Sequence, residues 1–186
     1  MINRCGWTSD DPVMNLYHDT EWGVPVHDDR KHYEFLVLDA FQAGLSWKTI
    51  LYRREGFRKA FKNFDPAEVA AFKPSDIEKL MQDAGIIRNR LKIEGSIKNA
   101  RAFMAVVKEF GSFDRYIWTF TNNRVMQPKR NTLHDIPATS PESDAMSRDL
   151  KKRGFSFVGS TICYAYMQAA GMVNDHICTC FRHSEL

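Results

Sequence analysis

Helical spacing of apolar residues is the feature that most restricts the fold of this chain of 186 residues. Apolar side chains recur every three or four positions in several segments, as at Phe35, Leu38 and Phe41. This spacing places them on one face of an α-helix. Residues 160–170 are apolar nearly all round, which is typical of a central buried helix. Strand-like alternation is scarce, with 155–158 as a weak candidate, so we predict an all-α fold of about eight to ten helices.

Helix start signals support this prediction. Asp11-Pro12, Asp65-Pro66 and Ser140-Pro141 each pair a capping acceptor with a proline at the first helical position. Residues 75–78 fit a capping box, in which the acceptor is followed three positions later by Glu. Residues 121–141 are polar and rich in proline, and we predict a long surface loop there.

Bulk composition excludes several classes of protein. The net charge of +3 and the pI near 8.7 permit a polyanionic partner but do not require one. No apolar signal segment opens the chain and no apolar run reaches the length of a membrane span, so we expect a cytoplasmic protein. The length suits one compact domain, residues 1–186. Four cysteines in such a chain indicate thiols or a metal site rather than disulfides.

One acidic residue interrupts the apolar stretch LVLDAFQAGLSW, residues 36–47. On a helix, Asp39 shares its face with residues that are mostly apolar: Phe35, Leu36, Gln42 and Ala43. Water would be largely excluded there, and an unpaired buried charge is costly. Two interpretations remain open. Asp39 either caps a helix or pairs with a basic residue, or it forms part of the wall of a ligand pocket.

Aromatic residues lie near this helix in the sequence. Trp7, Tyr17, Trp22 and Trp47 would be ordinary core residues in many proteins. Around a carboxylate, however, aromatic rings suit a flat, electron-poor or cationic ligand, which they bind by stacking and by cation–π attraction.

Residues 77–101 are amphipathic on both sides of Gly85. We expect this glycine to end a helix in the left-handed conformation. The next helix would then present unpaired N–H groups that can bind a phosphate, with Arg88, Arg90 and Lys92 following. The alternative is a plain helical hairpin with a solvated basic face.

Cysteine and histidine residues occur at both ends of the chain. Two thiolates and two imidazoles form a common tetrahedral structural zinc site. Each of these residues would also be ordinary as a core or surface side chain. Such a site would join the terminal segments 1–20 and 172–186, with Cys178 as a rival ligand to Cys180. The candidate ligands are Cys5, His18, His176 and Cys180.

Together these segments resemble a known family. In order, RCGW, YHDTEWGVP, QAGLSW, DAGIIRNR and KKRGFSFVGSTICYAYMQAAGMVNDH are similar to the signature segments of the bacterial 3-methyladenine DNA glycosylase I family, in the helix-hairpin-helix glycosylase superfamily. The resemblance covers essentially the whole chain. It implies an all-α glycosylase fold with a helix-hairpin-helix element at about 75–101. It also implies a structural zinc held by the four Cys and His residues named above.

The resemblance further implies an enzyme that flips an alkylated purine, 3-methyladenine, out of double-stranded DNA and hydrolyses its N-glycosidic bond. No membrane contact and no obligate protein partner is expected. The catalytic set would be Asp39, Tyr17 and Trp47. Further candidates for the base pocket are Trp7, Met14, Trp22 and Gln42. Candidates for DNA contact are Gly44, Leu45 as a wedge, Gly85, Arg88, Arg90 and Lys92.

This chain departs from the family pattern in three places. Asp39 stands where the family usually has Glu, which retracts the carboxylate by roughly 1.5 Å. Met14 stands where an aromatic residue is frequent, and the hairpin has Gly85 without a second glycine. Two alternatives follow. The protein would be a catalytically weak module that binds alkylation damage, or a glycosylase with a shifted base preference.

Overall fold

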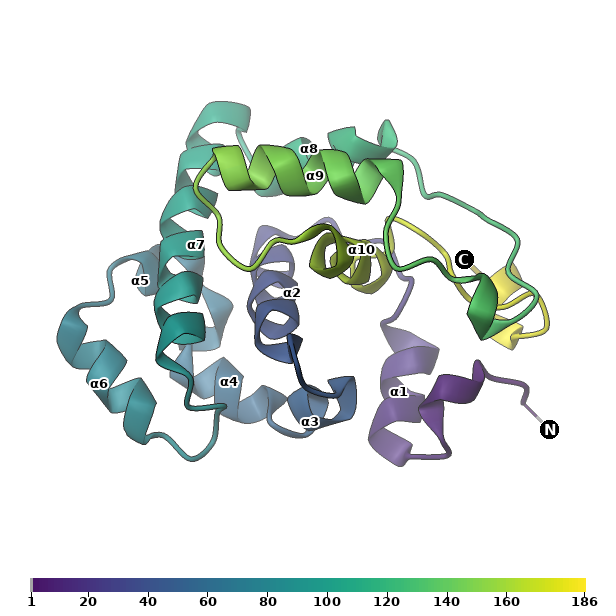
Figure 1. The fold of residues 1–186 in the computed structure, drawn as a ribbon, viewed down its shortest axis with the longest axis horizontal. Helices are drawn as coiled ribbons and strands as arrows, with labels where there is room; N and C mark the ends of the chain where they lie inside the picture. The colour runs from purple at the N-terminus through teal and green to yellow at the C-terminus, as the bar shows by residue number, and fades with distance from the viewer. Residues whose placement is uncertain (1) are drawn as a thin grey trace.

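The computed structural model describes residues 2–186, and its regular elements are helices (Figure 1). Within that range the α-helices are α1 (Pro12–Thr20), α2 (Asp29–Gln42), α3 (Trp47–Tyr52), α4 (Arg54–Ala60), α5 (Pro66–Ala70), α6 (Pro74–Gln82), α7 (Arg90–Phe110), α8 (Phe113–Ile117), α9 (Pro141–Lys152) and α10 (Ser160–Ala169). Short 3₁₀ helices are η1 (Gly6–Thr8), η2 (Lys62–Phe64), η3 (Trp118–Thr121), η4 (Leu133–Asp135) and η5 (Phe181–Ser184). The all-α prediction is confirmed. The strand suggested for 155–158 is wrong, because that segment is an irregular turn between α9 and α10.

Helix starts follow the predicted caps with one exception. The side chains of Asp11, Asp65 and Ser140 each accept hydrogen bonds from the first N–H groups of α1, α5 and α9. The capping box predicted at 75–78 is wrong by two residues. Helix α6 begins at Pro74, and the carboxylate of Asp76 accepts from the N–H of Lys73.

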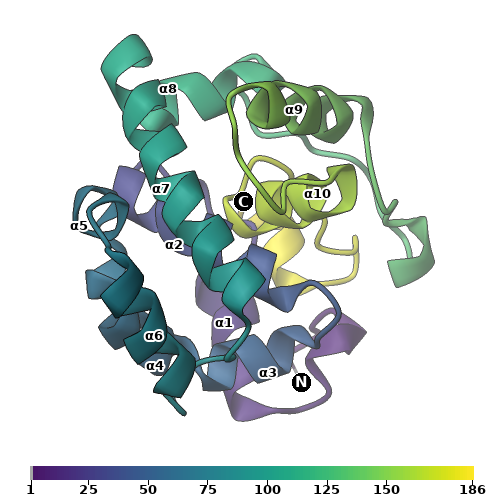
Figure 2. The same cartoon turned by 60° about the vertical axis from the view of Figure 1, so that its left-hand side comes forward.

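Helix α2 is the centre of the fold. Every residue from 32 to 41 is buried, because α7 and α10 pack against it. Figure 1 shows α2 between these two helices, with α1 and α3 near its C-terminal end. In Figure 2, α7 crosses the molecule with α5 and α6 alongside it. None of the described helices combines the length and the apolar character that a membrane crossing needs.

The turn between α6 and α7 differs from the prediction in its backbone. Gly85 does not adopt a positive φ, so it does not end α6 in the left-handed conformation. The close approach at this turn depends on Gly56 of α4, where an added Cβ would overlap the carbonyl oxygen of Gly85. The turn is closed by Asp83, whose carboxylate accepts from the N–H of Gly85 at 2.7 Å. The absence of a side chain at Gly56 therefore lets the hairpin pack directly on α4.

Residues 121–141 are more structured than the surface loop that we predicted. They contain η4, and Met126 exchanges backbone hydrogen bonds with Met172 and Asn174, both at 2.9 Å. The C-terminal segment also receives the N-terminus, since the N–H of Phe181 donates to the carbonyl of Asn3 at 3.0 Å. Three segments far apart in the sequence thus lie side by side at one end of the molecule (Figure 1).

Candidate active site

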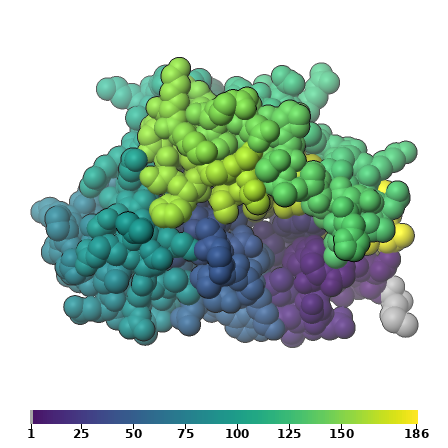
Figure 3. All heavy atoms as spheres, viewed as in Figure 1, coloured from purple at the N-terminus to yellow at the C-terminus, as the bar shows by residue number. Residues whose placement is uncertain are grey.

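A cavity of about 310 Å³ opens between α1, the α2–α3 turn and α10. In Figure 3 the surface is hollowed where the purple, blue and yellow-green parts of the chain meet. The cavity is lined by all the residues that the sequence placed in a base pocket: Trp7, Met14, Tyr17, Trp22, Asp39, Gln42 and Trp47. The lining residues that sequence reasoning missed are Ile136, Ala165, Gln168 and Ala169. Small or apolar residues on a buried helix carry no chemical signal, and Ile136 lies in the segment taken for a loop.

Asp39 has no hydrogen-bond or ion-pair partner among residues 2–186. Its side chain is 2% exposed, and Oδ2 is buried without a hydrogen-bond partner among residues 2–186. No ion pair involves this carboxylate in that range either, so the interpretation of Asp39 as a helix cap or salt-bridge partner is wrong. Burial raises the pKa of Asp39 well above its usual value, because the charged form loses its hydration. The carboxyl group therefore faces the cavity unsatisfied.

Aromatic rings form the other walls of the cavity. Tyr17 and Trp47 have ring centroids 5.3 Å apart at 52°, and Trp7 meets Trp22 edge-on at 5.1 Å. The indole N–H of Trp47 is buried and finds no acceptor in the described part of the chain. Burial, followed by the nearby Asp39, raises the pKa of Tyr17 well above its usual value, so the phenol keeps its proton. The cavity thus offers flat apolar walls with an unpaired acceptor and an unpaired donor.

Asp11 holds two of these walls together. Besides capping α1, its carboxylate accepts from the hydroxyl of Tyr52 at 3.0 Å and pairs with Lys48 at 2.6 Å. The hydrogen bond from Lys48 is the main reason that the pKa of Asp11 is lowered to about 2. Since Tyr52 and Lys48 belong to α3, this single carboxylate ties the helix of Tyr17 to the helix of Trp47.

A cluster of metal-ligating side chains lies directly behind the aromatic walls. The candidate ligand atoms of Cys5, His18, His176 and Cys180 are all buried and lie within 4.8 Å of one another. The Sγ atom of Cys180 is 3.4 Å from a ring nitrogen of each histidine. Ligands around a tetrahedral zinc ion are separated by about 3.6 Å when the metal bonds have their usual lengths, so these residues could hold that ion.

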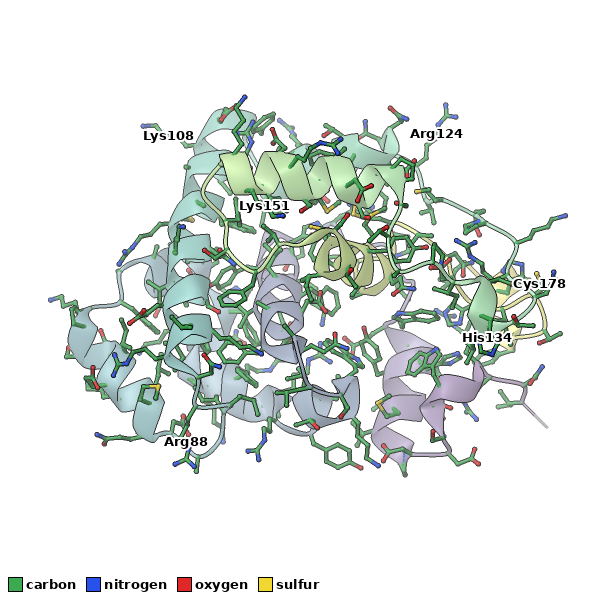
Figure 4. The ribbon with its side chains drawn as sticks, viewed as in Figure 1. Arg88, Lys108, Arg124, His134, Lys151 and Cys178 are labelled. Atoms are coloured by element: carbon green, nitrogen blue, oxygen red, sulfur yellow. The ribbon has the colours of Figure 1, made fainter. Side chains whose placement is uncertain are left out.

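The second ring nitrogen of each histidine is also bonded. Nδ1 of His18 lies 2.8 Å from the carboxylate of Asp19, and Nε2 of His176 lies 3.0 Å from the carbonyl of Trp22. Such outer contacts orient imidazoles toward a metal. Cys178 is exposed on the C-terminal segment and lies outside the cluster (Figure 4), so the idea that it rivals Cys180 is wrong. A turn at Ile177, not a helix, brings Cys180 to His176.

The α2–α3 turn projects a side chain beside the cavity mouth. Gly44 adopts a φ of +80°, a conformation that favours glycine, and Leu45 after it is 40% exposed. Lys92 does not face solvent as we predicted. It is 8% exposed, and its ammonium group donates to the carbonyls of Phe41 and Ala43 at 2.8 and 2.6 Å. Lys92 therefore fixes the end of α2, and its ammonium group is directed to these two carbonyls rather than to solvent.

The other hairpin candidates are exposed. Arg88 extends from the turn before α7 (Figure 4). Arg90 pairs with Glu78 of α6 at 2.8 Å, so part of its charge is already compensated. Two cationic side chains and the start of α7 thus remain on the outside of the molecule.

An all-helical protein with a cavity walled by aromatic rings, a buried acid without a partner among residues 2–186 and an exposed leucine on the adjoining turn has the features of enzymes that extract a nucleobase. The sequence pattern of the methyladenine glycosylase family matches residues 7–183, and the chain belongs to that family. DNA-3-methyladenine glycosylase 1 of Escherichia coli (strain K12) is 50% identical over 182 residues, covering 97% of each chain.

Solved structures agree with this assignment. A crystal structure of a 3-methyladenine DNA glycosylase I superposes with a TM-score of 0.94 at 49% identity, over 96% of this chain and 98% of the other. The enzyme from Staphylococcus aureus, studied for its recognition of 3-methyladenine, gives a TM-score of 0.93 at 32% identity, over 97% and 96%.

We expect Asp39→Asn to raise the melting temperature at neutral pH. A carboxyl group whose pKa is raised on folding stabilises the fold fully below its unfolded pKa of about 3.8 and loses that contribution as pH rises. The gain should therefore be absent near pH 4 and reach a few degrees at pH 7–8, where about 2–4 °C corresponds to each kcal/mol. Thermal unfolding of both proteins across this pH range measures it.

Asp76→Asn is the matched control. The pKa of Asp76 is lowered, mainly by the N–H of Lys73, so its removal should lower the melting temperature above pH 4 instead. A pH-independent effect of Asp39→Asn would contradict the raised pKa.

Proposed function

We propose that this protein is a DNA repair glycosylase that excises 3-methyladenine from double-stranded DNA by hydrolysing the N-glycosidic bond. The observation that carries the proposal is the unpaired carboxyl group of Asp39 inside an aromatic cavity. A buried carboxylate with no counter-charge is costly. A cationic ring that enters the cavity supplies the missing charge, and an unmethylated, neutral adenine does not.

The chemistry suits this cavity. Methylation at N3 makes the attached adenine cationic, so breaking the bond between C1′ and the base leaves a neutral molecule without prior protonation. Water adds to C1′ and releases a proton, giving an abasic site and free 3-methyladenine. The protein then needs mainly to bind the charged base, and to bind it more tightly while the bond between C1′ and the base is breaking than in the intact nucleotide. Tyr17 and Trp47 stack on the ring, and Asp39 accepts its N–H groups.

Access to the base requires flipping it out of the duplex, at a cost of a few kcal/mol. Leu45 projects beside the cavity from a turn that Lys92 holds rigid, and it fills the gap in the base stack. Arg88 in the turn before α7 and Arg90 at its start contact the phosphates of the strand, while the N–H of Gly85 stays bonded to Asp83. Arg90 remains partly neutralised by Glu78 and contributes less than Arg88.

We also propose that the protein binds a structural zinc ion, with Cys5, His18, His176 and Cys180 as its ligands. Without a cation, burial raises the pKa of the Cys5 thiol to about 12, with Cys180 adding to the effect. Zinc favours the thiolate form, and four protein ligands leave it no open position for chemistry. The ion would fasten the two ends of the chain behind Trp7 and Trp22.

Chromatography of bases released from methylated DNA tests the main proposal. We expect wild-type protein to release 3-methyladenine, and Asp39→Asn to lose at least about 100-fold in rate, since one preorganised charged group is removed. Asp39→Glu keeps the charge and should retain release. Undiminished release by Asp39→Asn would remove this carboxylate from the mechanism.

The same assay separates the alternatives. Binding of methylated DNA without any released base would favour a damage-binding module. Release of a different methylated base would favour a glycosylase with a shifted preference.

Salt dependence of DNA binding tests the hairpin. Arg88→Gln should lower the slope of log affinity against log salt by about 1, because one phosphate contact is lost. Lys92→Met should leave that slope unchanged, since Lys92 binds backbone carbonyls inside the protein. Fluorescence titrations at several salt concentrations give both slopes. If both variants lowered the slope equally, Lys92 would have to contact a DNA phosphate, contrary to this prediction.

Metal analysis tests the zinc proposal. We expect about one zinc per chain, lost in Cys180→Ser together with at least about 5 °C of melting temperature, as expected for a loss of two or more kcal/mol. Cys178→Ser is the matched control, because this thiol lies outside the cluster. Zinc-free wild-type protein of unchanged stability would refute the assignment.

A further inference from the structure

Gln168 is a cavity residue whose orientation is imposed from outside the cavity. It lies in the last turn of α10 and lines the cavity together with Asp39. Its amide Nε2 donates to Oδ2 of Asp175 at 2.9 Å. Both residues lie in the signature segment 151–176, but the resemblance assigned a role to neither.

Asp175 is a buried carboxylate with several donors around it. It is 1% exposed, and it also accepts from the hydroxyl of Tyr164 at 2.7 Å and from Nε of Arg130 at 2.9 Å. An ion-paired carboxylate only accepts hydrogen bonds. The Gln168 amide must therefore direct its NH₂ group toward Asp175.

This constraint leaves the amide oxygen of Gln168 free. No donor among residues 2–186 bonds to Oε1, and Oε1 is not among the buried unpaired atoms of that range. A glutamine amide can donate or accept, but Asp175 holds this amide so that its oxygen is the group available at the cavity wall. Tyr17 and Gln42 also line the cavity and can donate as well as accept, whereas Gln168 joins Asp39 as a lining side chain that offers the base an oxygen acceptor.

An N3-methylated adenine attached to its sugar carries N–H donors only on its exocyclic amino group, which has two hydrogens. A 6-oxo purine presents an oxygen at that position. When this oxygen faces an acceptor on the cavity wall, neither oxygen has a donor. A site built to hydrogen-bond a group rejects analogues that lack it.

We propose that Gln168 is a specificity-determining residue that selects purines with a 6-amino group, and that Asp175 acts on the base only by orienting Gln168. The inference rests on the proposed function. Asp39 takes one amino hydrogen and the charge of the ring, and Gln168 takes the other hydrogen. Selection between adenine-type and 6-oxo bases is then separate from selection for the methyl group.

Binding of two free bases tests the inference without DNA or catalysis. Both free bases are neutral, so the charge of the ring does not enter the comparison. 3-Methylhypoxanthine carries an oxygen in place of the 6-amino group and one ring N–H that 3-methyladenine lacks, and quenching of the cavity tryptophans reports the binding of each. We expect wild-type protein to prefer 3-methyladenine by about 10-fold or more, as one hydrogen bond of typical strength allows. Gln168→Met should abolish most of that preference by weakening 3-methyladenine alone. Gln127→Met, at an exposed glutamine outside the cavity, is the matched control and should change neither affinity.

Asp175→Asn provides the second variant. An asparagine can donate as well as accept, so the Gln168 amide is free to rotate and the preference should fall, as in Gln168→Met. Equal weakening of both bases by Gln168→Met, or an unchanged preference, would overturn the inference and assign Gln168 a purely structural role. Absence of 3-methyladenine binding and of base release by wild-type protein would instead refute the proposed function, and this inference with it.

Discussion

The carboxyl group of Asp39 lies where water is excluded and where no basic side chain of residues 2–186 pairs with it, and the rest of the site is arranged around that group. Leaving such a group unpaired costs free energy that a stable core would avoid by using an apolar residue. A site that must attract a cationic ring has reason to keep it, because the ligand removes the cost on binding. Binding and discrimination against neutral bases then have the same physical origin.

A carboxyl group used in this way must be held still, and the structure does so with groups that never reach the ligand. Lys92 secures the end of α2 beyond Asp39, and Asp11 joins the helices of Tyr17 and Trp47. Behind the aromatic walls, the cluster of Cys and His side chains joins the two ends of the chain. Each of these anchors is buried or partly buried, so each adds rigidity where a small displacement would cost most.

Local sequence patterns made the helix starts and the acid of the site predictable. Prolines after Asp11 and Ser140 located helix starts, and an acid on an otherwise apolar face pointed to Asp39 before any coordinates. Prediction failed where distant segments decide. Lys92 looked like a surface cation in a basic run, but α7 lies across the end of α2 and buries it. Gly85 looked like a helix stop, but its φ is not positive, and its carbonyl instead packs against Gly56 of α4.

The amino-acid sequence by itself determined the helical class, the family and the residue types of the base pocket, because periodicity, capping and signature segments are local properties of the chain. Only the tertiary structure decided what each group faces. It left Asp39 without a partner in the described range, turned Lys92 inward, brought Ile136 from an apparent loop to the cavity, and set the amide of Gln168 through Asp175. Burial and hydrogen bonding depend on neighbours tens of residues away, and no local pattern records them.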